Sequence, residues 1–475
     1  MKKNEKHQIF TTSEIVVNKW NRSQKLVLGI VTVTSFLGTF LVSSINVALP
    51  QIEGELHMSA ISLSWILTAF LLASAIFLMP LGKWADINGV KNVFRWGIVI
   101  FTLTTLFCGL APTGFFLIIF RFIQGIGGAI TASTGAAILV TKFPPAHRGR
   151  VLGISVSAVY LGLAMGPFFG GIITQNFGWR SIFFISSALG IIATIITFIF
   201  LEKDIITGKR EKIGLRGFFV YALALIAIIC GSSTIPKFFG WILIALGIVL
   251  FVLFFIIEAR HARPIIDVKL FTQNKLFAFS NIAALINYTA TFAIVFLLSL
   301  YLQKVKEFSP QQAGSILLIQ PLVMAVCSPL MGRLSDKIEP RFLATSGMSL
   351  CFIGLTIFAF INEFTPIFLI ITVLILVGLG FSLFSSPNMN TIMSSVSKNQ
   401  YGMASGIAGT MRVLGQMASM TLVTLFFALS FGKELISDVP KTLFVKVSSL
   451  LFALFAAICI VGIRISYQRG KLRGE

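Results

Sequence analysis

The sequence predicts an all-α integral membrane protein with fourteen transmembrane helices. Of its 475 residues, 56% are hydrophobic and only 12% are charged, and a water-soluble chain has no interior large enough to hide so much apolar surface. The apolar residues also form runs long enough to cross a hydrocarbon core of about 30 Å. A turn sequence beginning at Gly82 is repeated at Gly332, which indicates two similar halves.

Fourteen apolar runs follow a polar N-terminal arm. They lie near 26–49, 61–81, 93–111, 114–140, 151–174, 181–201, 215–235, 238–257, 276–302, 312–331, 342–361, 366–388, 402–430 and 443–466. The first run is too long for the apolar segment of a cleavable signal, and it lacks a small-residue cleavage site. We therefore expect it to remain in the protein as a spanning helix.

Lys and Arg residues predict the orientation of the chain. With the N-terminus in the cytoplasm, 29 of the 38 basic residues lie on the cytoplasmic side and 6 lie in outer loops. Positive charge gathers on the cytoplasmic side of membrane proteins, and an even number of spans brings both termini to one side. We expect a multi-pass protein of the plasma or inner membrane with cytoplasmic termini. The net charge of +21 then reflects topology and anionic lipid, and no nucleic-acid partner is expected.

The internal repeat consists of two predicted cytoplasmic turns, GKWADINGVK from Gly82 and GRLSDKIEPR from Gly332. Because the copies are eight spans apart, two six-helix halves require two further helices between them, a 6+2+6 arrangement typical of transporters built from repeated halves. The predicted parts are a cytoplasmic arm (1–25), an N-terminal six-helix bundle (26–201), a linker with two extra helices (202–275), a C-terminal six-helix bundle (276–466) and a basic tail (467–475).

A glycine-rich stretch, GLAMGPFFGG, lies in the fifth run. Gly162, Gly166 and Gly170 are four residues apart and share one helix face. Their lack of side chains lets another helix approach closely in lipid. Pro167 has no backbone donor and is expected to bend the helix. The alternative to a functional motif is an ordinary packing seam.

Taken together, these features resemble the major facilitator superfamily, in particular its fourteen-helix group of drug exporters. The first repeated turn resembles the family signature between helices two and three, with Ile87 and Val90 at positions where the family usually has basic residues. RFIQGIGGA from Arg121 resembles the fourth-helix signature, and the glycine-rich stretch resembles the fifth-helix signature associated with antiporters. INVALP from Ile45 is similar to the end of the first-helix signature. The resemblance implies the major facilitator fold.

The first helix departs from this family pattern. Related exporters typically have an acid five residues before the Asn of INVALP, whereas this chain has Leu41. We expect no Asp or Glu in the core of any other helix either. Drug–proton antiport is implied by the resemblance but does not follow from these residues. Carboxylates at helix ends, such as Glu258 and Asp86, remain candidates for titration.

Two arginines are expected near mid-depth in the membrane. Arg121 is about eight residues into the fourth run and Arg412 about ten into the thirteenth, roughly 12 and 15 Å along a helix. A guanidinium at such a depth is costly unless it faces a wet cavity or finds acceptors. We expect Arg121 to line a central cavity beside Gln124; a structural Arg bound by carbonyls and by the first helix is the alternative. For Arg412, cavity and helix contact are equally favoured.

The predicted functional residues form three sets. They are the substrate-cavity set (Asn46, Arg121, Gln124, Asn281, Gln320 and Arg412), the gating-loop set (Gly82, Asp86, Gly89, Lys91, Gly332, Asp336 and Arg341) and the fifth-helix antiporter-type set (Gly162, Gly166, Pro167, Gly170 and Gly171). In the gating set, the carboxylates could pair with basic groups or helix N-termini in one state and release them in another. Solvated turns that only set topology are the alternative.

The residues favour transport over catalysis. The five cysteines lie in apolar runs without CxxC spacing, and we found neither a metal-ligand pattern nor a phosphate loop. We expect no catalytic residue, cofactor or metal. The leading prediction is a secondary active transporter that works by alternating access, and the resemblance implies efflux of small amphipathic compounds.

The predicted partners are a small-molecule substrate and membrane lipid, with protons as the candidate coupling ion and a monomeric assembly. Basic residues without acidic companions in the helices favour neutral or anionic cargo. One alternative is an exporter or flippase of an anionic metabolite or lipid. Another, from a different class, is a non-transporting membrane sensor or scaffold.

Overall fold

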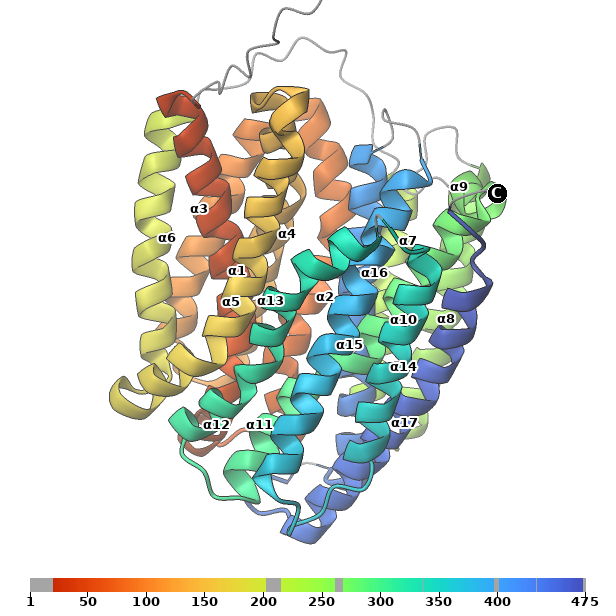
Figure 1. Ribbon diagram of the computed structural model, residues 1–475. Helices are drawn as coiled ribbons and strands as arrows, with labels where there is room; N and C mark the ends of the chain where they lie inside the picture. Colours follow the sequence, from red (N-terminus) through yellow and green to blue (C-terminus); the bar gives the residue numbers. More distant parts are fainter. Residues whose placement is uncertain are drawn as a thin grey trace, which may run out of the picture.

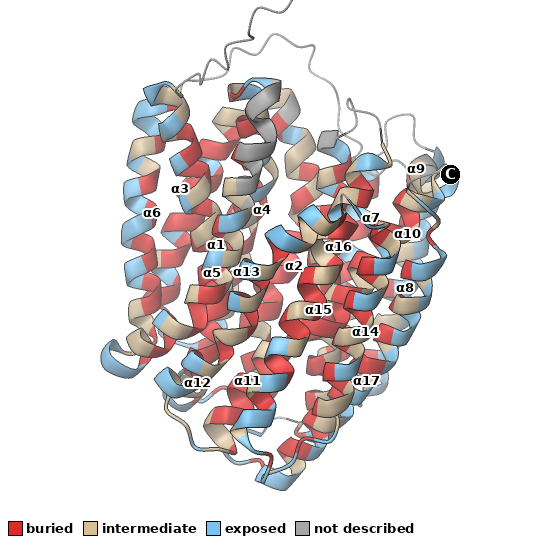
Figure 2. Cartoon of the chain, viewed as in Figure 1, coloured by how far each residue is buried: buried red, intermediate tan, exposed pale blue. Residues whose placement is uncertain are grey.

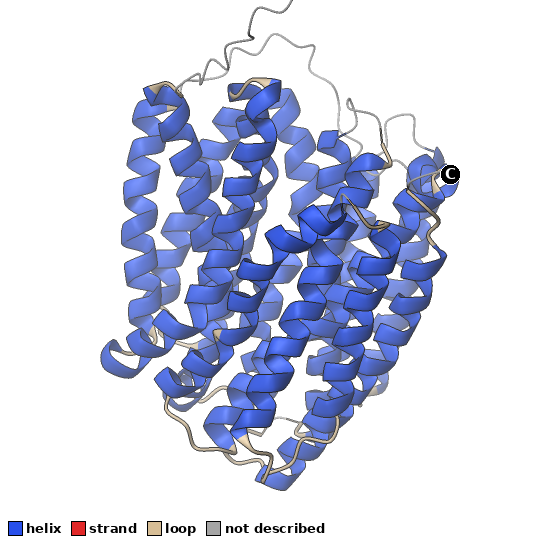
Figure 3. Cartoon of the chain, viewed as in Figure 1, coloured by secondary structure: helices blue, strands red, loops and turns tan. Residues whose placement is uncertain are grey.

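The computed structural model describes residues 20–201, 215–260, 268–335, 337–396, 401–432 and 434–472. In these ranges it contains 14 candidate membrane spans, as the sequence predicts, and no strand. Figures 1 and 3 show long helices lying side by side. The chain begins and ends at one end of the bundle, the upper end in Figure 1, and we call the opposite end the distal end.

The first six helices form the N-terminal bundle. They are α1 (Arg22–Leu56), α2 (Ala60–Asn88), α3 (Val90–Gly109), α4 (Gly114–Lys142), α5 (Pro145–Phe177) and α6 (Arg180–Phe200). The side chain of Asn21 caps α1 and that of Ser59 caps α2 by accepting backbone N–H groups,. Gly89 has φ of +93°, a backbone conformation that favours glycine, and it lets the chain turn directly from α2 into α3.

Two helices, α7 (Leu215–Thr234) and α8 (Phe238–Arg260), form the extra hairpin, and the short α9 (Val268–Gln273) follows. The hairpin packs on α2 and on α16 (Tyr401–Ser430). Trp65 Nε1 donates to Ser233 Oγ at 2.8 Å, and the Tyr221 hydroxyl donates to the carbonyl oxygen of Ala75 at 3.1 Å. These two bonds tie the hairpin to the N-terminal bundle.

The remaining helices form the C-terminal bundle. With α16, they are α10 (Lys275–Thr291), α11 (Ala293–Lys304), α12 (Pro310–Leu317), α13 (Ile319–Ser335), α14 (Pro340–Phe358), α15 (Ile367–Ser394) and α17 (Lys441–Gln468). Figure 2 shows buried residues concentrated along the inner faces of the helices and exposed residues on the outer faces. Large exposed apolar side chains such as Phe198 and Val249 are suited to contact with lipid chains.

Two predicted spans are divided, which is a correction to the expected continuous helices. The run expected at 276–302 is α10 and α11, and the Oγ of Ser419 accepts the N–H of Ala293 just after the division, at 3.1 Å. The run expected at 312–331 is α12 and α13. Pro321 has no N–H for the carbonyl of Leu317, four residues earlier, so the helical ladder is interrupted there.

Two carboxylates near the ends of helices are buried, and one of them lies in a part of α1 that was predicted to be outside the first span. The first helix does not end before Pro50 but continues to Leu56, so Glu53 lies within α1, and Glu258 lies within α8; each is only 3% exposed. Pro50 leaves the Asn46 carbonyl without its helical N–H donor. The hydroxyl of Ser299 in α11 donates to this carbonyl instead, at 2.6 Å, and this bond satisfies the freed group within the membrane.

Candidate functional site

The predicted close approach at the glycine-rich stretch is confirmed, and its partner is α1. A Cβ built on Gly166 would lie 2.6 Å from the Cβ of Ser43, and one on Gly170 would lie 2.6 Å from the Cβ of Ser44. The Ser43 hydroxyl also donates to the carbonyl oxygen of Leu163 at 2.9 Å. The backbones of α1 and α5 therefore meet without room for a side chain.

The end of the same stretch contacts the C-terminal bundle. A Cβ on Gly171 would lie 2.5 Å from the carbonyl oxygen of Pro310, and one on Gly314 would collide with the carbonyl oxygen of Pro167. Two glycines, one from each bundle, thus let α5 and α12 touch. The fifth-helix set serves two interfaces, one inside its own bundle and one between the bundles.

Arg121 is buried inside the N-terminal bundle, with an exposed fraction of 0%. Its Nε donates to the carbonyl oxygen of Ile66 at 3.0 Å and its Nη1 donates to Oε1 of Gln124. The guanidinium lies 4.6 Å from the ring centroid of Phe70. The predicted pairing with Gln124 is confirmed, but the expected exposure to a cavity is not met in this conformation.

The expected partners of Arg121 on the first helix are also not those that the structure shows. The acceptors come from α2 and α4, and Gln124 in turn donates to Thr105 Oγ1 of α3 at 2.6 Å. A buried guanidinium is tolerated where it has acceptors and an aromatic face. Arg121 and Gln124 therefore join three helices of one bundle.

Three other residues of the cavity set, Asn46, Asn281 and Gln320, are buried and come from three different helices, α1, α10 and α13. Asn46 is 6% exposed, Asn281 0% and Gln320 5%. The amide nitrogen of Asn281 donates to the carbonyl oxygen of Phe277 within its own helix at 2.9 Å. Each of the three side chains has an amide oxygen without a hydrogen-bond partner among the described residues. Among the described residues, no hydrogen bond joins these three side chains to one another.

Four polar side chains lie near one another between the two bundles: Tyr160, Tyr288, Ser385 and Arg412, which we call the central cluster. The hydroxyls of Tyr160 in α5 and Ser385 in α15 lie 3.3 Å apart. The Tyr288 hydroxyl in α10 interacts with Ser385 and lies within electrostatic range of Tyr160 and Arg412. The ring of Tyr288 packs edge-on against Phe381, with centroids 5.3 Å apart.

The central cluster contains one residue of the predicted cavity set, Arg412, which is half-buried in α16. Tyr160 and Ser385 were not predicted as site residues, because a Tyr or Ser in an apolar run usually makes a helix-packing contact. No signal in the sequence distinguishes these two residues from others of their kind. Their meeting depends on how the two bundles are placed against each other.

The gating set is only partly described. A Cβ on Gly332 would lie 2.8 Å from the hydroxyl of Ser386, closer than a Cβ normally approaches, whereas one on Gly82 would lie at an ordinary contact distance of 3.4 Å from the Cβ of Ser133. The guanidinium of Arg341 lies 4.7 Å from the ring centroid of Phe342 and 5.6 Å from that of Tyr467. The side chain of Asp86 and all of Asp336 lie outside the described part of the chain, so their pairing stays a prediction.

The two bundles are hydrogen-bonded to each other at the distal end. Besides the bond from Ser299, the amide of Gln303 donates to the carbonyl oxygen of Val47 at 3.0 Å. The hydroxyls of Ser64 in α2 and Thr424 in α16 lie 2.8 Å apart. These contacts close the distal end in this conformation.

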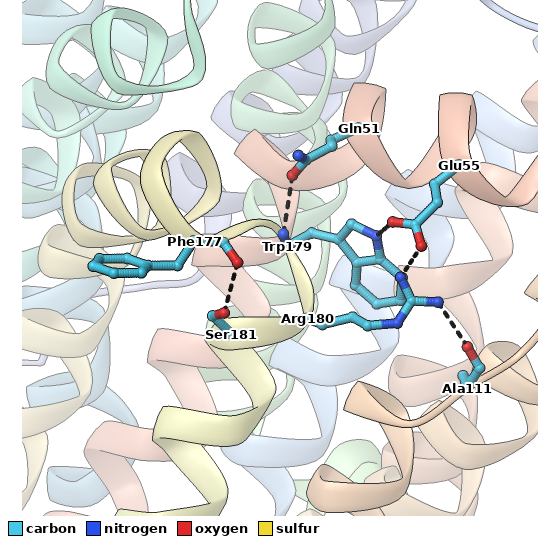
Figure 4. A network of polar contacts seen from close by, with 7 residues as sticks. All are labelled: Gln51, Glu55, Ala111, Phe177, Trp179, Arg180 and Ser181. Atoms are coloured by element: carbon cyan, nitrogen blue, oxygen red, sulfur yellow. Dashed lines mark hydrogen bonds and ion pairs between the residues drawn. The ribbon is translucent and has the colours of Figure 1, made fainter.

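A separate polar network holds the distal end of the N-terminal bundle together (Figure 4). Trp179 Nε1 donates to Oε2 of Glu55 at 2.6 Å, and the guanidinium of Arg180 forms an ion pair with the same carboxylate. Arg180 also donates to the carbonyl oxygen of Ala111 at 3.1 Å, and Gln51 accepts the backbone N–H of Trp179 at 2.9 Å. This network links α1 to the α3–α4 and α5–α6 turns.

Comparisons with known proteins identify the family. The model of the Major Facilitator Superfamily matches residues 30–420. The chain is 30% identical to the riboflavin transporter RibZ of Clostridioides difficile, over 92% of this chain and 96% of that protein. It is 28% identical to the multidrug resistance protein Stp of Mycobacterium tuberculosis, over 83% and 74% of the two chains.

A solved structure agrees at the level of the fold. It is a bacterial homologue of the human lysosomal transporter Spinster in an inward-facing, unoccupied conformation, with a TM-score of 0.68, 16% sequence identity and coverage of 95% of this chain and 97% of that chain. The family match covers more than half of the chain. The protein therefore belongs to the major facilitator superfamily of membrane transporters.

Proposed function

We propose that this transporter exports small amphipathic organic compounds from the cytoplasm by alternating access. Both termini then lie in the cytoplasm, because this orientation puts most of the basic residues on the cytoplasmic side of the membrane,. The two bundles move relative to each other so that a site between them opens first to one side and then to the other. Protons are the candidate coupling ion.

The central cluster is the observation that carries this proposal. It is built from α5 of one bundle and α10, α15 and α16 of the other, as expected of a substrate site between moving halves. Two tyrosine rings offer flat apolar contact with polar tips, and Ser385 adds a hydroxyl. Arg412 supplies positive charge, so the cluster suits an aromatic or amphipathic compound that is neutral or anionic.

The relatives support an organic substrate without deciding which one. One of them is named as a riboflavin transporter and another as a multidrug resistance protein. An aromatic compound such as riboflavin fits the two tyrosine rings of the central cluster.

Flux measurements on purified protein in liposomes test the proposal. Neutral probes including riboflavin, an anionic amphipathic dye and a cationic amphipathic dye are compared, each with and without a pH gradient. We expect the neutral and anionic probes to move faster than through protein-free liposomes. Transport of the cationic dye alone would contradict the proposed substrate class, and no movement of any probe would contradict export of such compounds.

Substitution of Arg412 tests the site itself. In Arg412→Gln, flux of the anionic probe should fall about tenfold or more, because one charge-assisted hydrogen bond to a substrate is lost, while flux of the neutral probe should fall less. Arg464→Gln is the matched control, since Arg464 is exposed on α17. Equal loss for both probes, or equal effects of the two substitutions, would argue against a cavity role for Arg412.

A further inference from the structure

Glu53 is a buried carboxylate that reaches from one bundle to the other. It lies three residues after Pro50 in α1, and its side chain is 3% exposed. Its Oε1 accepts the backbone N–H of Ile436 and that of Ser437, the latter at 3.2 Å. These residues belong to the segment between α16 and α17, here called the distal loop, of which residues 431, 432 and 434–440 are described. The acceptor and the donors are thus on opposite bundles.

The distal loop makes further contacts at the same place. The N–H of Ala60 donates to the carbonyl oxygen of Glu434 at 2.9 Å. Ile436 and Val439 are each 2% exposed, so their side chains in the distal loop are buried in the protein. Its backbone is therefore held against the junction of α1 and α2.

Two charged side chains of the C-terminal bundle act on the Glu53 carboxylate. Lys304, at the end of α11, attracts it, and Asp438 in the distal loop repels it. The ammonium of Lys304 donates to the carbonyl oxygen of Ser437, at 2.9 Å. The hydrogen bonds to the Glu53 carboxylate come from the backbone N–H groups of Ile436 and Ser437. Hydrogen bonds from N–H groups to an ionised carboxylate are roughly twice as strong as neutral ones.

We propose that Glu53 is the positioning residue of the extracellular gate, and that its bonds to the distal loop favour the conformation closed at that end. The gate can open only if Ile436 and Ser437 move away and water replaces their N–H groups at the carboxylate. The inference rests on the proposed function, because it assumes that the bundles alternate and that the distal end is extracellular. Beyond the proposed function, it assigns to Glu53 the role of favouring the closed state of the distal end over the open state.

Glu55 provides a matched comparison within the same helix. Its carboxylate binds Trp179 and Arg180, which belong to the same bundle as α1, as Figure 4 shows. These partners move with Glu55 when the bundles separate. A substitution at Glu55 can weaken the N-terminal bundle but has no direct effect on the balance between closed and open states.

Distance measurements between spin labels test the proposal. In protein whose five native cysteines are replaced, labels are placed at Asn176→Cys at the distal end of α5 and Phe364→Cys in the turn between α14 and α15; both positions are exposed. The ratio of long to short distances between the labels reports opening of the distal end. Glu53→Ala, Glu53→Gln and the control Glu55→Gln are compared with the parent.

We expect Glu53→Ala to raise the open-to-closed ratio about tenfold or more, because two hydrogen bonds to a charged group are lost. Glu53→Gln should give a smaller increase, since its amide oxygen still accepts but carries no charge, and Glu55→Gln should leave the ratio unchanged. If Glu53→Ala yields no folded protein, Glu53→Gln decides. Identical ratios for Glu53→Gln and Glu55→Gln would overturn the proposal.

The distance measurement needs no substrate, so it separates this inference from the proposed function. A shifted ratio in a protein that moves none of the probes would support the role of Glu53 and contradict the proposed export. Probe flux in the parent, together with an unshifted ratio in both Glu53 variants, would support export and contradict the role of Glu53.

Discussion

At the residue scale, Arg121 shows how a buried charge is accommodated inside one bundle. Its fork of N–H groups reaches the carbonyl oxygen of Ile66 and the side chain of Gln124, and Phe70 lies beside the guanidinium. The spacing of three residues was enough to predict the pair with Gln124. It could not predict Ile66, because the contact between α2 and α4 exists only in the folded bundle.

Arg121→Lys should destabilise the protein while keeping the charge. A lysine ammonium lacks the planar fork and cannot match both acceptors in the same geometry, and an unsatisfied buried polar group costs on the order of 1–3 kcal/mol. Thermal unfolding in detergent, followed by tryptophan fluorescence, should show a lower Tm than that of the parent. Unchanged Tm with lost flux would instead indicate that Arg121 acts on the substrate.

Glu307 and Lys441 form an exposed ion pair at the distal end. The hydrogen bond and charge of Lys441 hold the pKa of Glu307 below its ordinary value. The pair therefore contributes fully above the ordinary pKa, and its contribution disappears as the pH falls through the lowered pKa. Because both groups are exposed to solvent, the effect on stability is small.

Lys441→Met should return the pKa of Glu307 to the ordinary range. The measurement is ¹³C NMR of the side-chain carboxyl carbons as the pH is lowered, with Glu307→Gln to assign the resonance. Addition of salt should raise the pKa in the parent, because salt screens the attraction. A parent pKa that is the same as that of Lys441→Met would contradict the effect of the ion pair.

At the element scale, the packing of α5 on α1 follows from four-residue glycine spacing. The pattern predicted which face of the helix would be bare, and the structure shows that Ser43 and Ser44 lie against it. The partner helix could not be predicted from spacing alone, since any neighbour with small residues fits such a face. The break between α12 and α13 was also not predicted. The sequence contains Pro321 at this place, but a proline can also lie within a continuous helix, as Pro50 does in α1.

Gly166→Ala should lower stability more than Gly38→Ala. A Cβ on Gly166 would lie 2.6 Å from Ser43 and 2.9 Å from the backbone nitrogen of Ser44, whereas one on Gly38 would meet nothing within 4 Å. Replacing glycine by alanine in a helix otherwise gains about 0.5–1 kcal/mol. We expect thermal unfolding to show a lower Tm for Gly166→Ala and an equal or higher Tm for Gly38→Ala. Equal shifts for the two variants would mean that α1 and α5 can separate without cost.

At the scale of the whole molecule, the contacts between the bundles define the conformation. Their distal ends are joined through Asn46, Val47 and Ala60 on the N-terminal side. On this side the bonded groups are backbone carbonyl and N–H groups, which residues of almost every type possess, and their partners are the side chains of Ser299 and Gln303 and the carbonyl oxygen of Glu434. Apart from Pro50, which leaves one carbonyl free, no residue pattern on this side predicts these bonds.

A disulfide across the distal end should arrest transport. The backbone N–H of Ala60 and the carbonyl oxygen of Glu434, on opposite bundles, are hydrogen-bonded with an N-to-O distance of 2.9 Å. Two residues bonded in this way have Cα atoms close enough for a disulfide. In protein without native cysteines, Ala60→Cys with Glu434→Cys should cross-link under oxidation, abolish probe flux and recover it on reduction. The two single variants are the controls. Full flux in the cross-linked protein would show that the distal end need not open.

The sequence by itself determined the membrane setting, the fourteen spans and the family, because hydrophobic length, charge placement and short motifs are local properties. It also predicted the pairing of Arg121 with Gln124 and the bare face of the fifth helix. The tertiary structure decided that Tyr160 of one bundle meets Ser385 of the other near Tyr288, and that Glu53 binds the distal loop. These contacts join residues far apart in the chain, and they depend on how two separately folded bundles are placed together, which local patterns do not encode.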